Sequence, residues 1–468
     1  MNQKITNLIK GIVTITVFVA VLFVANKILM LKSEDGIEQM QAYYKQKENT
    51  VDALFLGSSK VYCQIDTGII WDEYGISSFD LGGAEAPSWV CYYYLKEALK
   101  TQKPKVIMYE TTIAGYREDV LEEPEVWAIT NNYGFKWNEN RIGQLKDNST
   151  KNGFFDLLIP FGSTHSKYKD LKKDDFVDSN NTINYKGFDS RETIVPFERP
   201  DMSNVTESEP VNEKHIIYLK KMNELAKENG IPFIVMVSPY VVTEEEQRYF
   251  NYVFDVCEEE GIPYIDFNKM YDELQIDFES DMAENIHLNL SGSKKWTEYL
   301  GKYLSENYSL EDHRGDSKYS SWDKDALWNR QDRLRFEISR ADNSNKLDLI
   351  KDNNNYIVYI TFNDEINDLS DDYKSKLNSL GISDEMFIEN AEIIIGNGEV
   401  GFISTEKTFE AFIDEKDMKL MFRRTEEDEP AELFVNEDRY EFDYSNNVRM
   451  VIYDRVLKKV VGEIDGIY

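Results

Sequence analysis

Short apolar runs alternate with amphipathic helical segments between residues 51 and 308, and this alternation limits the fold more than any other feature. The runs that fit buried strands are Val51–Leu56, Lys105–Glu110, Ile231–Val237 and Ile262–Phe267. The segments with helical periodicity are Trp89–Lys100, Asn212–Asn229, Thr243–Glu260 and Ser291–Asn307. Strands separated by helices of this length predict a parallel sheet with helices on both faces. Catalytic groups in such a sheet lie at the carboxyl ends of the strands.

Two further regions depart from this alternation. Residues 113–210 are rich in Trp, Tyr and Asn and are too long for a simple loop, so we expect an insertion that covers or shapes the site.

Residues 309–342 are polar and predict a linker with one helix over 324–340. Residues 343–468 predict a separate strand-rich α/β domain with a helix over Asp371–Leu380. Its expected strands are Tyr356–Phe362, Ala391–Ile395, Glu432–Asn436 and Arg449–Asp454.

The N-terminus carries an uncharged run, Gly11–Asn26, which approaches the ~20 residues that cross a bilayer once its flanks are included. The run ends without a clean A-x-A site, which favours an uncleaved anchor over a cleaved signal peptide. We therefore expect a cytoplasmic tip and transmembrane anchor over residues 1–31 and a short stalk over 32–49. The prediction is a single-pass protein of the cell membrane whose soluble domains, beginning at residue 50, are extracellular.

The composition excludes some classes of function. A formal net charge of −33 disfavours binding to nucleic acid phosphates. The three cysteines, Cys63, Cys91 and Cys257, have no zinc-site spacing, and Cys91 and Cys257 are expected in the core. The sequence has no metal motif and no GxGxxG nucleotide motif, so no cofactor is expected.

Two motifs at opposite ends of the first α/β domain suggest hydrolase chemistry. Ser59 closes the turn Gly57-Ser58-Ser59 after the first strand, where its hydroxyl would be exposed at the top of the sheet. His287 precedes the last helix, and Glu284 lies three residues before it, within reach of the imidazole. Each motif alone is weak, because such a turn is usually only a turn and a lone histidine is more often a surface or core residue.

The remaining candidates are less suitable. Asp281 is a reserve acid for His287 at a poorer spacing. His165 lies in the insertion and is either structural or part of a substrate groove. His215 lies beside Lys214 on a helix and is expected to be exposed, and His313 falls in the linker.

The chain resembles the SGNH (GDSL-like) hydrolase superfamily, and within it the Gram-positive, membrane-anchored DltD-like branch. The resemblance rests on GSS at Gly57–Ser59, FDLGGAEAP at Phe79–Pro87, KEALKTQKPKVIMYE at Lys96–Glu110, HLNLSGSKKWTEYL at His287–Leu300 and the block Leu158–Phe176.

This resemblance implies a three-layer, flavodoxin-like SGNH fold over residues 50–308. Ser59 would be the nucleophile and His287 the base, and Glu284 would stand where the family places an aspartate. The N–H groups of Ser59 and of Gly82 or Gly83 would form the oxyanion hole. The third block, Tyr109–Thr112, lacks the asparagine that many family members have.

The last region, 343–468, is similar to interleukin-like (ILEI-type) domains, through YIVYITFNDEINDLSDDYKSKLNSLGI and YEFDYSNNVRMVIYDRVLKKVVGEIDGIY. Such domains are lectin-like in shape and occur beside glycan-modifying proteins. The resemblance implies binding to glycan or to a protein partner, and a scaffold without a ligand is the alternative.

The leading hypothesis is an extracytoplasmic serine acyl-hydrolase or acyltransferase that acts on O-acyl esters of a cell-surface polysaccharide. By family analogy its partner would be a membrane-bound O-acyltransferase. One alternative is a non-catalytic SGNH-fold surface protein that binds glycan or such a partner. Another is a lipid or carbohydrate esterase that works alone.

Overall fold

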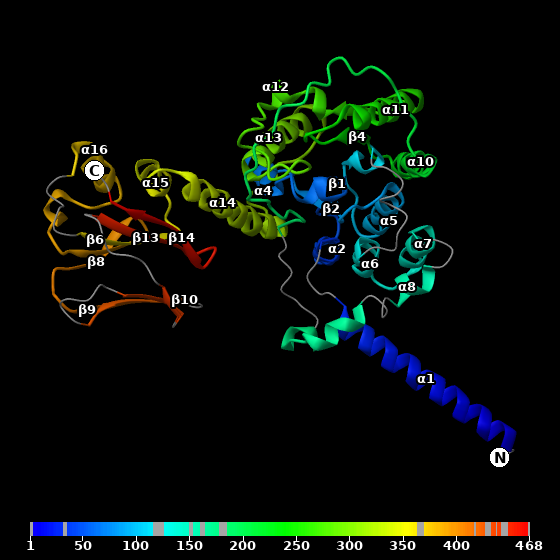
Figure 1. The fold of residues 1–468 in the computed structure, drawn as a ribbon, viewed down its shortest axis with the longest axis horizontal. Coiled ribbons are helices and arrows are strands. Elements are labelled where there is room, and N and C mark those ends of the chain that lie inside the picture. Colours follow the sequence, from blue (N-terminus) through cyan, green and yellow to red (C-terminus); the bar gives the residue numbers. More distant parts are fainter. Residues whose placement is uncertain are drawn as a thin grey trace. The chain divides into compact units, whose positions relative to one another are not determined.

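The protein has two compact units, Met1–Ala326 and Leu327–Tyr468 (Figure 1). Each unit has its own hydrophobic core. A computed structural model describes residues 3–30, 35–115, 126–148, 153–159, 164–176, 185–362, 369–415, 418–425, 432–436, 438–440 and 448–466.

A five-stranded, fully parallel sheet forms the centre of the first unit, in the order β2-β1-β3-β4-β5. The strands are β1 (Ala53–Gly57), β2 (Ser78–Gly82), β3 (Val106–Glu110), β4 (Phe233–Val237) and β5 (Tyr264–Asp266). This is the strand order of flavodoxin-like doubly wound sheets. The chain passes from β1 to β2 on one side and returns to β3 on the other. The carboxyl ends of β1 and β3 therefore form the switch point where such folds place their sites.

Helices cover both faces of this sheet, as the alternation predicts (Figure 1). They are α2 (Ile37–Tyr44), α3 (Ser59–Tyr62), α4 (Thr67–Tyr74), α5 (Ser88–Ala98), α10 (Glu213–Glu228), α11 (Glu244–Glu260), α12 (Tyr271–Leu274) and α13 (Leu290–Asn307), with a 3₁₀ turn η5 (Phe267–Lys269). Leu54 and Leu56 of β1 pack in the core formed with α5 and α10. Ala53 and Phe55 pack on the opposite face with α4 and α13. Burial on both faces explains why β1 is apolar at every position.

The N-terminal helix α1 (Gln3–Leu29) is long and apolar enough to span a membrane. Part of the expected insertion, 113–210, is also helical. Its described elements, with the turn before them, are η1 (Thr112–Gly115), α6 (Val126–Tyr133), α7 (Glu139–Asn148), α8 (Phe154–Leu158), η3 (His165–Lys169) and η4 (Lys173–Phe176). Its residues 116–125, 149–152, 160–163 and 177–184 lie outside the described residues.

Two segments that were expected to be connectors contribute to the core of the first unit. In the expected stalk, 32–49, helix α2 buries Met40 and Tyr43 against the sheet. In the expected linker, 309–342, the turn η6 (Ser317–Tyr319) and helix α14 (Ser320–Arg340) bury Tyr319 and Trp322 in the same core. A helical segment with a few aromatic residues and polar flanks resembles a linker in composition. Its burial becomes evident only from its tertiary contacts.

The second unit contains two antiparallel sheets, in the orders β14-β13-β6-β7-β8 and β12-β11-β10-β9. The strands are β6 (Tyr356–Phe362), β7 (Glu392–Gly396), β8 (Glu399–Ser404), β9 (Phe409–Glu415), β10 (Met418–Arg424), β11 (Glu432–Val435), β12 (Asp438–Tyr440), β13 (Val448–Asp454) and β14 (Lys459–Asp465). The helices are α15 (Asn343–Ile350), α16 (Asp371–Ser379) and the 3₁₀ turn η8 (Asp384–Met386). The expected strand-rich region is therefore present, and its likeness to ILEI-type domains remains a prediction.

Candidate active site

The nucleophile candidate Ser59 lies at the carboxyl end of β1, as the first residue of the short helix α3. Gly57 closes the strand where a Cβ would lie 2.9 Å from Glu110 Cβ, so the turn needs glycine to pass β3. Ser58 is the N-cap of α3, and its Oγ accepts a hydrogen bond from the N–H of Lys60 at 3.4 Å. The two serines are therefore not equivalent, because Ser58 caps the helix and Ser59 turns its hydroxyl to the site.

The histidine lies in a tight antiparallel turn just before α13, which we call the His loop (residues 281–289). The N–H of Ala283 donates to the carbonyl of His287 at 2.9 Å, and that of Asn289 donates to Asp281 at 2.9 Å. Asn289 then caps α13 by accepting from the N–H of Ser291 at 3.0 Å. Because the chain reverses within this turn, Glu284 is returned to the side of His287.

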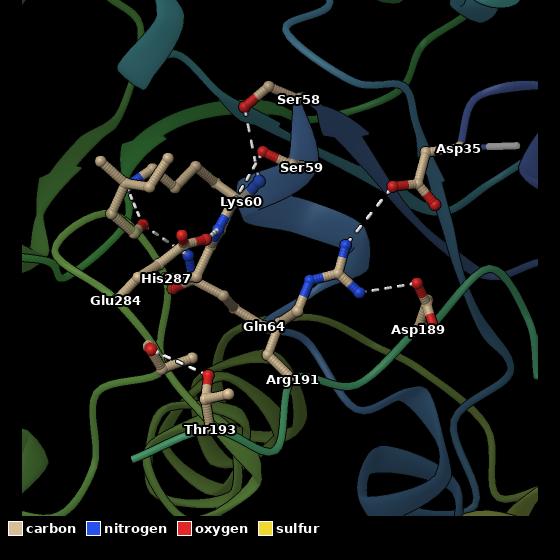
Figure 2. Close-up of polar contacts among 12 residues, drawn as sticks. Asp35, Ser58, Ser59, Lys60, Gln64, Asp189, Arg191, Thr193, Glu284 and His287 are labelled. Atoms are coloured by element: carbon tan, nitrogen blue, oxygen red, sulfur yellow. Dashed lines mark hydrogen bonds and ion pairs between the residues drawn. The ribbon is translucent and has the colours of Figure 1, made fainter. Parts of the chain in front are cut away.

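Ser59, His287 and Glu284 form a continuous hydrogen-bonded chain (Figure 2). Ser59 Oγ lies 2.7 Å from His287 Nε2, and Glu284 Oε1 lies 2.5 Å from His287 Nδ1. The imidazole is 8% exposed, whereas the Glu284 side chain is 53% exposed. The structure thus brings together the three side chains that the sequence singled out.

The reserve acid Asp281 is bound elsewhere. Its Oδ2 pairs with Lys295 Nζ at 2.6 Å and accepts from the N–H of Asp277 at 2.8 Å. Asp281 therefore ties the start of the His loop to α13, and Glu284 is the carboxylate that reaches the imidazole.

The surroundings of His287 favour its neutral form. Burial lowers the pKa of His287 below its ordinary value, and the positive charge of Lys60 lowers it further, while Glu284 opposes both effects. A neutral imidazole at neutral pH is able to accept the serine proton at Nε2.

Lys60 is a functional candidate that sequence reasoning missed. It follows Ser59 directly, yet its side chain is buried, and its Nζ donates to the carbonyl of Ile286. Gln64 Nε2 donates to the same carbonyl at 3.3 Å, and Lys60 Nζ lies 3.5 Å from the centre of the Tyr240 ring (Figure 2 labels Lys60 and Gln64). The residue next to His287 is therefore held by the helix that carries Ser59.

Burial also changes the charge on Lys60. It lowers the pKa of Lys60 to about 7, although the nearby carboxylate of Glu110 acts in the opposite direction. Glu110 is itself buried at the end of β3, and burial raises its pKa. A lysine directly after the candidate nucleophile and a glutamate at the end of an apolar strand were the available signals for this pair.

An extended segment, residues 189–199, runs along the His loop on its other side, and we call it the strap. The N–H of Val195 donates to Met282 O at 3.0 Å, and Thr193 Oγ1 donates to Ala283 O at 2.8 Å. The strap also brings Arg191 into the site, where its guanidinium pairs with Asp189 at 2.8 Å and with Asp35 at 3.4 Å (Figure 2). The end of the insertion thus helps to shape the site.

The two glycines predicted for an oxyanion hole lie beside the nucleophile turn. Gly82 ends β2 opposite Gly57, and a Cβ on it would lie 2.9 Å from the carbonyl oxygen of Ser58. The N–H of Gly83 donates to Gly57 O at 3.3 Å. Their role as oxyanion donors, together with the N–H of Ser59, remains a prediction.

The other histidines lie outside the triad. The expectation that His215 is exposed was wrong, because the residue is buried and its Nδ1 lies 2.6 Å from Ser88 Oγ. His165 is exposed on η3, and His313 pairs with Asp52 at 2.8 Å. Within the described ranges, no group of three or more His, Cys, Asp or Glu side chains is placed to hold a metal ion.

Comparisons with known proteins add little. No family model and no curated protein matches the chain. Among solved structures, a Bacteroides fragilis protein provisionally described as an acylhydrolase matches with 9% sequence identity and a TM-score of 0.30. The match covers 57% of this chain and 93% of that one. A likeness of this size carries no argument about fold or function.

Proposed function

We propose that this chain is a serine acyl-hydrolase or acyltransferase whose catalytic residues are Ser59, His287 and Glu284. The observation that carries the proposal is the hydrogen-bonded chain from Ser59 Oγ through the imidazole to Glu284. A serine hydroxyl is a weak nucleophile until an adjacent base takes its proton, and the third group keeps that base in the required orientation.

The reaction proceeds in two halves. Ser59 Oγ attacks the ester carbonyl carbon while His287 Nε2 takes the hydroxyl proton, and Glu284 stabilises the imidazolium through Nδ1–H. The tetrahedral intermediate then collapses, the ester C–O bond breaks, and the imidazolium returns its proton to the departing alcohol. Water or an acceptor hydroxyl next attacks the acyl carbon while His287 Nε2 takes its proton. The bond from that carbon to Ser59 Oγ then breaks, and the imidazolium returns the proton to Ser59 Oγ.

As the substrate we propose O-acyl esters of a cell-surface polysaccharide, handled outside the cytoplasm with a membrane-bound O-acyltransferase as partner. A helix long and apolar enough to anchor the chain supports a substrate at the membrane. The SGNH and DltD-like resemblance of the sequence motifs is the reason for choosing this ester class.

Labelling with a fluorophosphonate probe tests the proposal. We expect the full-length protein to be labelled, and Ser59→Ala and His287→Ala to lose labelling. Ser58→Ala and His165→Ala are matched controls, because Ser58 caps α3 and His165 lies outside the triad. We expect both controls to be labelled at close to the wild-type rate.

Two results would contradict the proposal. One is a folded wild-type protein that the probe does not label, and the other is labelling that persists in Ser59→Ala. A folded wild-type protein without labelling would favour the second candidate, a surface protein of the same fold that binds glycan or a partner. Labelling that persists in Ser59→Ala would show that another side chain is the nucleophile. The 53% exposure of Glu284 favours that candidate, because an exposed carboxylate holds an imidazole less firmly than a buried one.

A further inference from the structure

Exposed apolar side chains are concentrated on one part of the first unit, outside α1. We call residues 126–148, 153–159 and 164–176 the insertion lobe. Of the thirteen large apolar side chains that are exposed outside α1 in the described parts of the chain, six belong to this lobe. They are Trp137 (49% exposed), Phe155 (74%), Ile159 (41%), Tyr168 (61%), Leu171 (36%) and Phe176 (62%). Such a concentration marks a surface with a partner.

The same lobe packs on the C-terminal end of α1. Met30, directly after α1, is buried with Ile129, Leu145 and Leu157 of α6, α7 and α8. Its carbonyl accepts a hydrogen bond from Lys167 Nζ at 3.0 Å. The ring of Trp137 lies 6.1 Å from that of Phe23, within α1 itself. The lobe therefore lies level with the last turns of the apolar helix, where a spanning helix meets the membrane–water interface.

The charge of this region differs from that of the rest of the chain. Residues 126–176 contain eight Lys and Arg against six Asp and Glu, whereas the whole chain carries −33. Lys169, Lys172 and Lys173 are exposed in the same short stretch as Tyr168 and Leu171, with the exposed Asp170 between them. Aromatic side chains together with lysines suit the headgroup region of an anionic bilayer.

We propose that the insertion lobe lies in the headgroup layer of the membrane that α1 enters, as a second contact with lipid. Phe155, Tyr168 and their apolar neighbours enter the interface, and the lysines contact anionic headgroups. The inference rests on insertion of α1 and does not depend on any catalytic activity of Ser59. The proposal predicts that both α1 and the insertion lobe contact the bilayer, so that the first unit is not attached through a flexible linker alone.

Site-directed labelling of the full-length protein in lipid vesicles tests this proposal. The native cysteines Cys63, Cys91 and Cys257 are buried, so a fluorophore can be attached at one added cysteine. The test positions are Phe155→Cys and Tyr168→Cys, and the positive control is Val13→Cys in α1. The matched negative control is Phe254→Cys on α11, which is exposed to 44% but lies outside the lobe. The lipids carry a quencher on their acyl chains.

We expect quenching at residues 155 and 168 to exceed that at residue 254 several-fold. Quenching at 155 and 168 that equals the value at 254 would overturn the proposal whether or not residue 13 is quenched. The replaced side chains are largely exposed, and a thermal melt of each variant checks folding.

The role of the lysines is tested separately with vesicles of zwitterionic lipid alone and with vesicles that contain anionic lipid. We expect quenching at residue 155 to be stronger with anionic lipid, and this difference to disappear in the triple variant Lys169→Glu, Lys172→Glu and Lys173→Glu. Equal quenching in both lipids would show that the contact is apolar and that the electrostatic part of the proposal is wrong.

Discussion

At the residue scale, the candidate site depends on side chains that support the imidazole without touching an ester. Lys60 holds the carbonyl next to His287 and also places a positive charge near the ring. Glu284 holds Nδ1 and places a negative charge there. These two side chains act on the histidine in opposite electrostatic directions, so their substitutions are expected to have opposite effects on its titration.

The decrease in labelling rate at low pH reports the pKa of His287, because the attack of Ser59 needs a neutral imidazole. Since burial and Lys60 lower this pKa, we expect the acid midpoint below pH 6.5. Lys60→Gln removes the positive charge and is expected to raise the midpoint by about 0.5–1 pH unit. Labelling rates of both proteins between pH 4 and pH 9 measure the shift, and an unchanged or lower midpoint in the variant would contradict the role of Lys60.

Glu284→Gln keeps the size of the side chain but removes the charge that stabilises the imidazolium. We expect its labelling rate to fall about 10²–10⁴-fold, in the range of acid substitutions in other serine triads. Asp281→Asn is the matched control, because Asp281 pairs with Lys295 and not with His287. We expect Asp281→Asn to lower the melting temperature but to change the labelling rate little. A labelling rate that falls further in Asp281→Asn than in Glu284→Gln would make Asp281 the functional acid.

At the element scale, three segments distant in sequence hold the His loop. Helix α3 reaches the carbonyl of Ile286, the strap pairs with Met282 and Ala283, and the cap of α13 ends the turn. Because all three segments make hydrogen bonds to the His loop, several independent contacts fix the position of His287 relative to Ser59. Such support is expected of a site whose groups must stay aligned.

Asn289 connects two of these elements. It caps α13 and donates to Ser280 O at 2.8 Å and to Thr193 O at 3.3 Å. We expect Asn289→Ala to cost about 1–3 kcal/mol of stability and to slow labelling, because the loop loses its anchor. Asn212→Ala removes a comparable cap from α10, which supplies no triad residue, and is expected to lower stability without slowing labelling. Thermal melts and labelling rates separate the two effects.

At the scale of the whole molecule, every described residue of the candidate site belongs to the first unit. The second unit has two cores of its own. One lies between its two sheets, and the other lies between the five-stranded sheet and helices α15 and α16. The boundary of the first unit lies later than composition suggests, because α14 begins inside its core. Trp322 Nε1 donates to Ser78 O at 3.2 Å, and Trp71 Nε1 donates to Asp323 at 3.0 Å.

Two truncations test this boundary. A chain that ends after Arg340 retains α14 and is expected to keep labelling at Ser59 within a few-fold of the full chain. A chain that ends after Tyr308 loses Trp322, whose removal from a core costs about 3–5 kcal/mol. We expect the shorter chain to be destabilised or aggregated in thermal melts and gel filtration. Equal stability of the two chains would show that residues 309–326 do not belong to the first unit.

The sequence by itself was sufficient to predict local features of this protein. The strand–helix alternation predicted the parallel sheet, because a strand buried on both faces is apolar throughout. The apolar run predicted α1, and the strands β6, β7, β11 and β13 were predicted by their apolar composition. The pairing of Glu284 with His287 could also be predicted, since Glu284 lies only three positions before His287 in a turn.

Only the tertiary structure decided which distant side chains meet. The burial of Lys60, the pairing of the strap with the His loop and the burial of His215 depend on contacts between residues that lie 87 to 226 positions apart in the sequence. The same holds for α2 and α14, whose polar flanks resemble connectors. Local composition reports the propensity of a segment, but burial depends on the surface that the rest of the chain presents to it.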